Sequence, residues 1–228
     1  MQIIVIHKGN IRTFTETINS ILGSELYNFV ERIIAVVSDT PNMKDEYCNI
    51  LHQKDQLIFN QDKCIYSAMN IGLKMCEVGH VIFLNSGDFL TSQMSSYDWT
   101  NIKKSIVFLP KILIDGQQYT ARSHKVKNHQ NMVYFLDSKK SLVFFDEEKG
   151  PLADAEWIKT VCSDCLEMND SLAIFTYGGI STRPRFLQAI KYYLKYPNKR
   201  YFKLVCKATL ISLGFENISK RILISKYG

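Results

Sequence analysis

Short apolar runs separated by polar turns dominate the first 90 residues of the chain. The runs occupy residues 3–6, 32–37 and 81–84, and the second of them opens on Arg32. A strand that is apolar along its whole length is typically covered on both faces, as in a parallel sheet. Residues 56–59 predict a further short strand. Stretches with helical spacing lie between the runs, so the pattern predicts right-handed βαβ units and a largely parallel sheet.

Two of the intervening stretches repeat apolar residues at the spacing of one helix face. The first contains Phe14, Ile18, Ile21 and Leu22. We expect Thr13 or Thr15 to cap its start and Gly23 to end it. The second contains Ile65, Met69, Leu73 and Cys76, and Gly79 is expected to end it. Residues 43–53 suit a third helix.

The pattern is weaker beyond residue 90. Residues 106–109 and 111–114 predict two strands around Pro110, and Asp115-Gly116 predicts a hairpin turn. A helix is expected from about residue 152, carrying Trp157, Val161 and Leu166. Residues 173–175 predict a last short strand.

The strand at residues 81–84 ends in the polar turn Asn85-Ser86-Gly87-Asp88. Ligands of open α/β sheets bind beyond the carboxyl ends of the strands. A carboxylate there suits a divalent metal held against a phosphate, and the neighbouring glycine lets a ligand approach closely. An ordinary surface turn has the same composition, so the spacing leaves both interpretations open.

The run from Ile65 to Leu90, IYSAMNIGLKMCEVGHVIFLNSGDFL, resembles the central signature of family 2 glycosyltransferases with a GT-A fold. That signature reads approximately D-x-G-I-Y-D-A-M-N-K-G, followed by a helix and a strand that closes in L-N-S-G-D. The matching residues are Ile65, Tyr66, Ala68, Met69, Asn70, Gly72, Leu84, Asn85, Ser86, Gly87 and Asp88. Cys64 and Ser67 depart from it, standing where the signature has Gly and Asp.

The resemblance implies a Rossmann-like α/β fold with a mostly parallel central sheet flanked by helices. It also implies inverting transfer of a hexosyl or N-acetylhexosaminyl group from a nucleotide-sugar, UDP-linked in our expectation, to a hydroxyl group. The acceptor implied is a lipid-linked oligosaccharide in the synthesis of a bacterial surface polysaccharide, O-antigen (lipopolysaccharide) or capsule.

The resemblance further implies a donor site at the start of the chain. Asn10 is the one match in the first turn, and Asp39 is expected to bind the uracil or ribose, although it also suits a turn before Pro41. Asp88 is expected to hold Mn²⁺ or Mg²⁺. His129 is expected at the diphosphate or at an acceptor hydroxyl; the alternative is a solvent-facing loop histidine. The complete set of expected donor-binding residues is Asn10, Asp39, Asp62, Asn70, Asn85, Ser86, Asp88 and His129.

On the acceptor side, Asp154 matches the aspartate that acts as catalytic base in this family. The positive end of a helix dipole would keep it ionised in a first helical turn. The same residue also suits a helix start that has no chemical role, and Glu156 is the second candidate for the base. The remaining acceptor-side residues expected are Gln130, Trp157, Gly178, Gly179 and Ser181, the last three from the motif F-x-x-G-G-x-S.

The 228 residues suit one domain with a short appendage. We expect a catalytic domain at residues 1–182, with a nucleotide-sugar half at 1–90 and an acceptor half at 91–182, and a tail at 183–228. No uninterrupted apolar run reaches the ~18 residues of a membrane span, and residues 1–10 resemble a first strand rather than a leader. The expected location is the cytosol. Cys162 and Cys165 are expected to be free thiols on a helix, rather than part of a zinc or redox site.

Charge is concentrated in the tail. The chain has a net charge of +6, but the segment from Arg183 onward holds eleven Lys or Arg and one acid, Glu216. Apolar stripes such as Phe186, Ile190, Tyr193 and Leu194 predict two basic amphipathic helices, separated at Pro197-Asn198. Such helices bind the interface of an anionic membrane. The alternative is that the stripes dock on the catalytic domain. No motif indicates nucleic-acid binding.

The expected partners are therefore the nucleotide-sugar donor, a lipid-linked glycan acceptor and the inner face of the cytoplasmic membrane; the sequence is also compatible with a homodimer. Two other functions remain. A nucleotidyltransferase needs a Gly-rich basic loop after the first strand, of which Lys8-Gly9 is a poor version. A sugar-nucleotide-binding protein without transferase activity would have the donor site alone.

Overall fold

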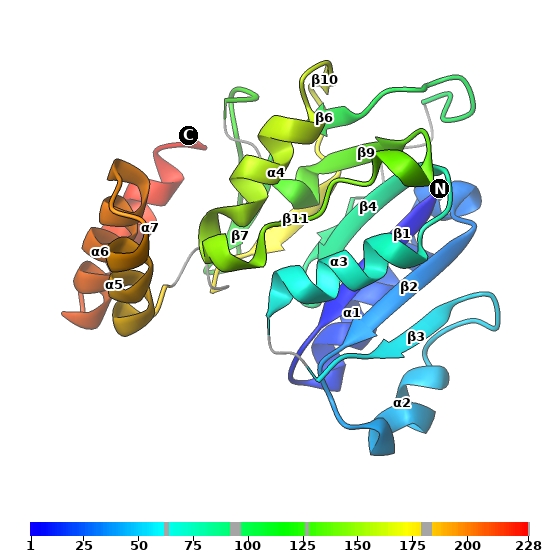
Figure 1. Ribbon diagram of the computed structural model, residues 1–228, viewed down its shortest axis with the longest axis horizontal. Helices are drawn as coiled ribbons and strands as arrows, with labels where there is room; N and C mark the ends of the chain where they lie inside the picture. The colour runs from blue at the N-terminus through cyan, green and yellow to red at the C-terminus, as the bar shows by residue number, and fades with distance from the viewer. Residues whose placement is uncertain (62–63, 92–96, 126–127, 179–183, 228) are drawn as a thin grey trace.

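The structure is a computed structural model of residues 1–228, and it describes all of them except 62–63, 92–96, 126–127, 179–183 and 228. A seven-stranded sheet forms its centre (Figure 1). Along the sheet the strand order is β10-β6-β9-β4-β1-β2-β3. All neighbouring pairs are parallel except those of β9, which is antiparallel to both β4 and β6. The strands are β1 (Gln2–His7), β2 (Arg32–Val37), β3 (Gln56–Phe59), β4 (Gly79–Asn85), β6 (Ile106–Phe108), β9 (Met132–Leu136) and β10 (Leu166–Met168).

Helices cover both faces of this sheet, which explains the uninterrupted apolar strands. Along β1, Ile3 and Val5 pack in the core that contains α1 (Ile11–Leu22). Ile4 and Ile6 point to the opposite face, where the core contains α3 (Ile65–Met75) and α4 (Ala153–Val161). Burial of both faces removes every side chain of β1 from water. The expected mostly parallel α/β sheet flanked by helices is confirmed.

Gly72 permits the close packing of α3 on β1. A Cβ atom at this position would lie 2.5 Å from Cγ2 of Ile4, well inside van der Waals contact. Any larger residue would force α3 and β1 apart. This packing gives a structural reason for one of the glycines in the matched signature.

A second, four-stranded sheet has the order β5-β11-β7-β8. Its strands are β5 (Phe89–Leu90), β7 (Lys111–Ile114), β8 (Gln117–Thr120) and β11 (Ala173–Thr176). The turn between β7 and β8 is the expected Asp115-Gly116 hairpin turn, with φ of 50° and 81°. β5 follows the Asn85–Asp88 turn directly and pairs with β11, so the second sheet anchors that turn.

Two helix boundaries differ from the sequence predictions. Asn10, not Thr13 or Thr15, caps α1, and its side chain accepts a hydrogen bond from the backbone N–H of Arg12. Gly23 ends α1 as expected. Gly79 does not end α3, which stops at Met75; it begins β4 with φ of 134°. The chain needs a glycine at that point to turn into the strand, rather than to leave the helix.

The expected helix at residues 43–53 is shorter than predicted. It consists of α2 (Lys44–Cys48), preceded by the 3₁₀ helix η2 (Pro41–Met43). The other 3₁₀ helices of the described chain are η1 (Glu25–Phe29), η3 (His129–Asn131), η4 (Lys139–Ser141) and η5 (Glu147–Leu152).

The end of α4 corrects two further predictions. The helix stops at Val161, so Leu166 lies on β10 and not on the helix. Cys162 and Cys165 form a disulfide, and the prediction of two free thiols on a helix is therefore wrong. The reason is that the chain leaves the helix at Cys162, which brings the two Cα atoms within 5.1 Å, inside the range for disulfides.

Three helices end the chain: α5 (Phe186–Lys195), α6 (Lys199–Ser212) and α7 (Glu216–Ile224). They lie together at one end of the molecule, beside the layers that cover the central sheet (Figure 1). The sequence pattern predicted the first two and missed the third. Among the described helices, none is both long enough and apolar enough to cross a membrane.

Candidate functional site

The polar residues that end β1, β2 and β4 lie side by side at the carboxyl edge of the central sheet. The register pairs Ile6 with Asn85, and His7 with Val37. The buried His7 ring connects the strand ends: Nδ1 is hydrogen-bonded to Ser86 Oγ at 2.8 Å, and Nε2 lies 3.7 Å from Asp39 Oδ2. Burial lowers the pKa of His7, against the opposing effect of Asp39. His7 therefore joins the turn after β2 to the turn after β4 as a neutral imidazole at pH 7.

Asp39 lines a hollow of about 380 Å³ beyond this edge. The hydroxyl group of Tyr47, on α2, donates a hydrogen bond to Asp39 Oδ2 and fixes the carboxylate. The hollow is lined by Gly9, Ser38, Asp39, Thr40, Met43 and Gln61. The structure thus places Asp39 at an open site, whereas the Asn10 side chain serves as the cap of α1.

Asp88 is buried, with 5% of its surface exposed, and receives three hydrogen bonds. Its Oδ1 accepts from the Thr176 N–H at 3.1 Å, and its Oδ2 accepts from Gln130 Nε2 at 2.9 Å and from the Asn85 N–H at 3.3 Å. Burial raises the pKa of Asp88 to about 6, although these donors and the nearby His129 act in the opposite direction. Among the described residues no Lys or Arg forms an ion pair with Asp88, so within them the carboxylate is stabilised mainly by N–H groups.

Two threonines that the sequence analysis missed fix the Asp88 turn. The Thr17 hydroxyl donates to the backbone oxygen of Asp88 and accepts from the Gly87 N–H, both at 2.9 Å. The Thr176 hydroxyl donates to the Gly87 oxygen at 2.6 Å. Thr17 lies on the buried face of α1, between Phe14 and Ile18. A polar residue on that apolar stripe was the available signal.

His129 and Asp154 form the other half of the cluster. The His129 side chain is buried, packed edge-on to the rings of Phe83 and Phe145. Its Nδ1 lies 3.5 Å from Asp154 Oδ2, and neither ring nitrogen has a hydrogen-bond partner within the described residues. A buried imidazole without partners is costly, so both ring nitrogens have the capacity to bind a further polar group. The alternative of a solvent-facing histidine is thus wrong.

The neighbouring residues His129 and Gln130 connect the two carboxylates of the site. Gln130 binds Asp88, and His129 lies beside Asp154. Both residues belong to the short helix η3 that leads into β9. The antiparallel pairing of β9 with β4 brings this element to the central sheet. Residues distant in sequence, at 88 and 154, are thereby brought to one site.

Asp154 is partly exposed, at 20% for its side chain, and lies in the first turn of α4. Its Oδ1 accepts a hydrogen bond from the Ala155 N–H at 2.8 Å. Tyr66 of α3 is close to it: burial, and then the charge of Asp154, raise the pKa of the Tyr66 phenol well above its usual value. Tyr66 therefore stays a neutral hydroxyl group.

Asn70 positions the segment that precedes α4. Its Nδ2 donates to the Phe145 oxygen and to Glu147 Oε1, both at 3.0 Å, and its Oδ1 accepts from the Phe145 N–H at 2.8 Å. Both ends of the side-chain amide are thus used within the protein. Asn70, expected to bind the donor, thus links α3 to the segment that contains Phe145 and Glu147.

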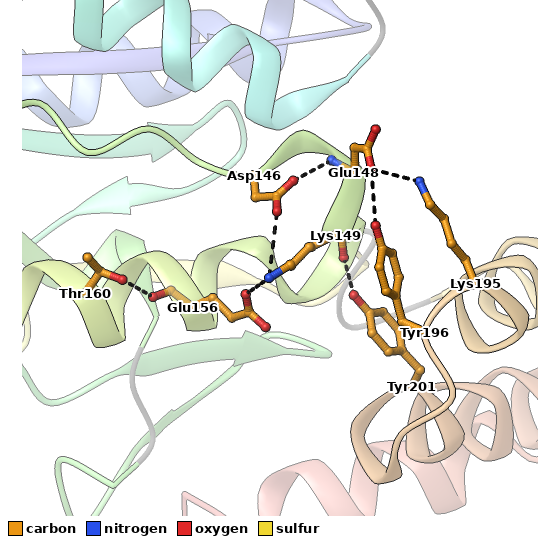
Figure 2. A network of polar contacts seen from close by, with 8 residues as sticks. All are labelled: Asp146, Glu148, Lys149, Glu156, Thr160, Lys195, Tyr196 and Tyr201. Atoms are coloured by element: carbon orange, nitrogen blue, oxygen red, sulfur yellow. Dashed lines mark hydrogen bonds and ion pairs between the residues drawn. The ribbon is translucent and has the colours of Figure 1, made fainter.

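The other expected acceptor-side residues, apart from Gln130, have different surroundings. Glu156 forms an ion pair with Lys149 at 2.5 Å (Figure 2). Trp157 is buried against Phe145, with ring centroids 4.5 Å apart, and so packs in the core instead of facing an acceptor. Gly178 follows β11 in a turn with φ of 128°. Gly179 and Ser181 lie outside the described residues, as does the expected donor-binding residue Asp62.

The oxygen atoms of Asn85 and Asp88 suit a divalent cation. Asn85 Oδ1 is buried without a hydrogen-bond partner in the described part of the chain, and Asp88 Oδ1 accepts a single hydrogen bond, which leaves a lone pair. Among the described residues, no group of three or more His, Cys, Asp or Glu forms a complete metal site. The residues therefore fit an ion whose remaining ligands are phosphate oxygens and water, as Mg²⁺ accepts.

Solved structures with a similar fold identify the fold of this chain. The first 349 residues of S. aureus TarS match with a TM-score of 0.60 and 15% identity, over 77% of this chain and 60% of TarS 1–349. The same TarS fragment in complex with UDP-GlcNAc matches with a TM-score of 0.63 and 14% identity, over 92% of this chain and 66% of that one. The chain has a GT-A fold. It is shorter than these TarS fragments, of which it spans 60% to 66%.

No protein-family model matches the chain, and no curated protein matches its sequence at a significant level. At 14–15% identity the structural likeness carries the fold alone. Membership of family 2 therefore remains a prediction from the motif at residues 62–90.

Proposed function

We propose that the protein is an inverting glycosyltransferase that moves a hexosyl or N-acetylhexosaminyl group from a UDP-sugar to a hydroxyl group. The observation that carries this proposal is the bridge formed by His129 and Gln130 between Asp154 and Asp88. Through these contacts a partly exposed carboxylate, which we propose as the base, belongs to the same cluster as a buried carboxylate at the carboxyl edge of the sheet, where ligands of such sheets bind. The TarS structures on the same fold include complexes with UDP and with UDP-GlcNAc, which supports a nucleotide-sugar donor.

In this proposal the donor lies along the carboxyl edge. The nucleobase and ribose occupy the hollow at Asp39, whose carboxylate is held ready to accept N–H or hydroxyl hydrogen bonds. The diphosphate lies over the turn that contains Asn85, Ser86 and Asp88. Asp88 and Asn85 hold Mn²⁺ or Mg²⁺ against it. When bound, the ion neutralises charge that develops on the departing diphosphate.

Asp154 acts as the base in this proposal. It accepts the proton of the acceptor hydroxyl while the hydroxyl oxygen attacks the sugar carbon and the nucleoside diphosphate leaves from the opposite face. The first turn of α4 stabilises the ionised carboxylate through the helix dipole. The His129 ring lies beside this carboxylate, with Nδ1 3.5 Å from Asp154 Oδ2. Glu156 is committed to Lys149 and is not the base.

The acceptor we propose is a lipid-linked oligosaccharide in the synthesis of a bacterial surface polysaccharide, O-antigen or capsule. Family resemblance at residues 62–90 supports this assignment. The reaction would take place in the cytoplasm, at the inner face of the cytoplasmic membrane. A homodimer is compatible with the proposal.

The test is a panel of UDP-sugars, assayed for UDP release with and without Mn²⁺ or Mg²⁺. We expect one donor to be hydrolysed slowly with the metal, and faster when a lipid-linked glycan acceptor is added. Melting-temperature shifts measured in parallel report binding separately. A protein stabilised by UDP and Mn²⁺ that released no UDP from any donor would be a sugar-nucleotide-binding protein, which would overturn the transferase proposal.

A further inference from the structure

An exposed apolar surface runs along α5 and α6. We call it the α5–α6 apolar face and define it by Phe186, Leu187, Leu194, Phe202 and Leu213. Leu187 and Leu194 are 80% and 75% exposed. Several large apolar side chains exposed together, unlike single ones, indicate an interaction surface. The rings of Tyr193 and Phe202 lie 5.8 Å apart, so the apolar stripes of the two helices meet.

The opposite side of α5 and the start of α6 are fixed to the catalytic part of the chain. Figure 2 shows this attachment at η5. Lys195 forms an ion pair with Glu148 at 3.0 Å, and the Tyr196 hydroxyl donates to the same carboxylate. The Tyr201 hydroxyl donates to the Lys149 backbone oxygen at 2.8 Å. Contacts made by polar groups and tyrosines therefore hold the helices and direct the leucines outward.

α7 provides a second attachment. Lys220 forms an ion pair with Asp115 in the β7–β8 turn at 2.7 Å. Tyr227, just beyond α7, is buried and packs against Phe175 of β11, with ring centroids 6.0 Å apart. The three helices are thus attached at two places, and the α5–α6 apolar face keeps a fixed orientation.

The C-terminal helices that carry this face are rich in positive charge. Residues 184–227 contain ten Lys or Arg and one acid, Glu216. Lys191, Lys199 and Lys203 are exposed and form no ion pair within the part of the chain that the structure describes. Lys191 lies on α5 between Leu187 and Leu194, and Lys203 follows Phe202 on α6. Exposed leucines and phenylalanines are thus bordered by free ammonium groups.

We propose that the α5–α6 apolar face rests on an anionic lipid bilayer. Apolar side chains at this surface would enter the acyl boundary, while the bordering lysines bind lipid phosphates. The membrane and the docked arrangements are then compatible, since one side of the helices docks on the domain and the other faces lipid. This inference concerns binding alone and does not rest on the proposed transferase reaction. For that reaction, it would place a lipid-linked acceptor next to α4.

The test is flotation of the full chain with vesicles of phosphatidylcholine alone, or of phosphatidylcholine with phosphatidylglycerol. We expect binding to the anionic vesicles and at least about tenfold less to the neutral ones. Leu187→Glu/Leu194→Glu should lose at least about tenfold of the binding, and Lys191→Glu/Lys203→Glu a similar amount. Val78→Glu and Lys140→Glu make the same changes at exposed residues outside the C-terminal helices and should bind as the wild type does.

Two outcomes would overturn the proposal. The first is equal binding of the wild type and the Leu187→Glu/Leu194→Glu variant. The second is no vesicle binding by the wild type together with a dimer, measured by sedimentation, that Leu187→Glu/Leu194→Glu converts to a monomer; a second copy would then cover the face. Circular dichroism and melting temperature verify that the variants fold, as expected for changes at such exposed positions. UDP binding is measured separately on the same variants. It shows whether a loss of vesicle binding is accompanied by damage to the donor site.

Discussion

The two carboxylates of the candidate site stand in opposite environments. Asp88 is almost entirely buried, receives three N–H donors and has a pKa raised to about 6 by burial. Asp154 is partly exposed, receives one N–H donor and lies beside a buried imidazole without hydrogen bonds. The first carboxylate is fixed in place by its surroundings, whereas the second keeps an open side toward solvent.

The difference suits two roles, anchoring a ligand and accepting a proton. An aspartate in a sequence motif does not by itself show which of these roles it has. A group that anchors a ligand or an ion needs a fixed position, and the threonines and backbone donors around Asp88 supply it. A group that accepts a proton needs a free oxygen and an open side, and Asp154 has an Oδ2 that accepts no N–H hydrogen bond from the described residues and a partly exposed side chain. We therefore expect substitutions at the two positions to alter different steps of the reaction.

The largest effect is expected from Asp154→Asn. Loss of a general base lowers transfer by about 10² to 10⁴. UDP binding and melting temperature should change little, because Asp154 is partly exposed and accepts a single hydrogen bond. Initial rates of sugar transfer measure the effect. Glu156→Gln, on the same helix, is the matched control and should retain most of the activity. Wild-type turnover by Asp154→Asn would contradict the assignment.

Asp88→Asn should lower transfer by about a hundredfold and also weaken donor binding in the presence of Mn²⁺, unlike Asp154→Asn. Isothermal titration with UDP and Mn²⁺ measures this second effect. If the variant bound UDP and Mn²⁺ as the wild type does, the anchoring role of Asp88 would be wrong.

The pH dependence of stability gives an independent test of the burial of Asp88. Its folded pKa, about 6, lies above the ordinary 3.8, so between these values the folded protein holds a proton that the unfolded chain has lost. The free energy of unfolding should then fall as pH rises through this window, by on the order of 2–3 kcal/mol, and stay lower above pH 6. Chemical denaturation of the wild type and of Asp88→Asn from pH 4 to pH 7 measures it. Parallel curves for the two proteins would show that Asp88 is not buried.

His129→Phe tests whether the histidine acts in the site or in the core. The ring is buried among aromatic residues, so phenylalanine should preserve or raise the free energy of unfolding. Transfer should nevertheless fall by about tenfold, because the group beside Asp154 is lost. Measurements of the free energy of unfolding and of the transfer rate, on the wild type and on His129→Phe, distinguish the two roles. A destabilised variant with a normal rate would indicate a purely structural histidine.

The smallest effect on the reaction is expected from Asn70→Ala. The change removes three hydrogen bonds to Phe145 and Glu147, and should lower the free energy of unfolding by about 2–3 kcal/mol. We expect the affinity for UDP to remain within about threefold of wild type, since the amide is occupied within the protein. A large loss of UDP affinity in a variant that remains stable would indicate that Asn70 binds the donor after all.

Local patterns in the sequence predicted much of the central sheet. The apolar runs at β1, β2 and β4 predicted buried strands correctly, because both faces of these strands are covered. The strands β2 and β3 also have the bounds that the sequence predicted. Prediction was weaker at the ends of elements. Gly79 shows why: a glycine after a helical stretch suits the end of the helix, yet here the same freedom of φ serves the first residue of a strand.

The site was predicted less completely, because its partners come from distant segments. Asp88 and Asp154 were both expected from the family resemblance. No local pattern shows that Gln130 binds Asp88 or that His129 lies beside Asp154, since these contacts depend on the antiparallel strand β9. Burial likewise cannot be read from a motif: Trp157 suited an acceptor surface in sequence but packs in the core.

The central claim is that donor and base meet at the carboxyl edge of the central sheet. A crystal structure with UDP and Mn²⁺ tests it most directly. We predict the uracil in the hollow beside Asp39, the diphosphate and the ion at the turn of Asn85 and Asp88, and the Asp154 carboxylate facing the diphosphate across His129. A nucleotide bound away from this edge, with Asp88 still enclosed by its N–H donors and no ion beside it, would contradict the account.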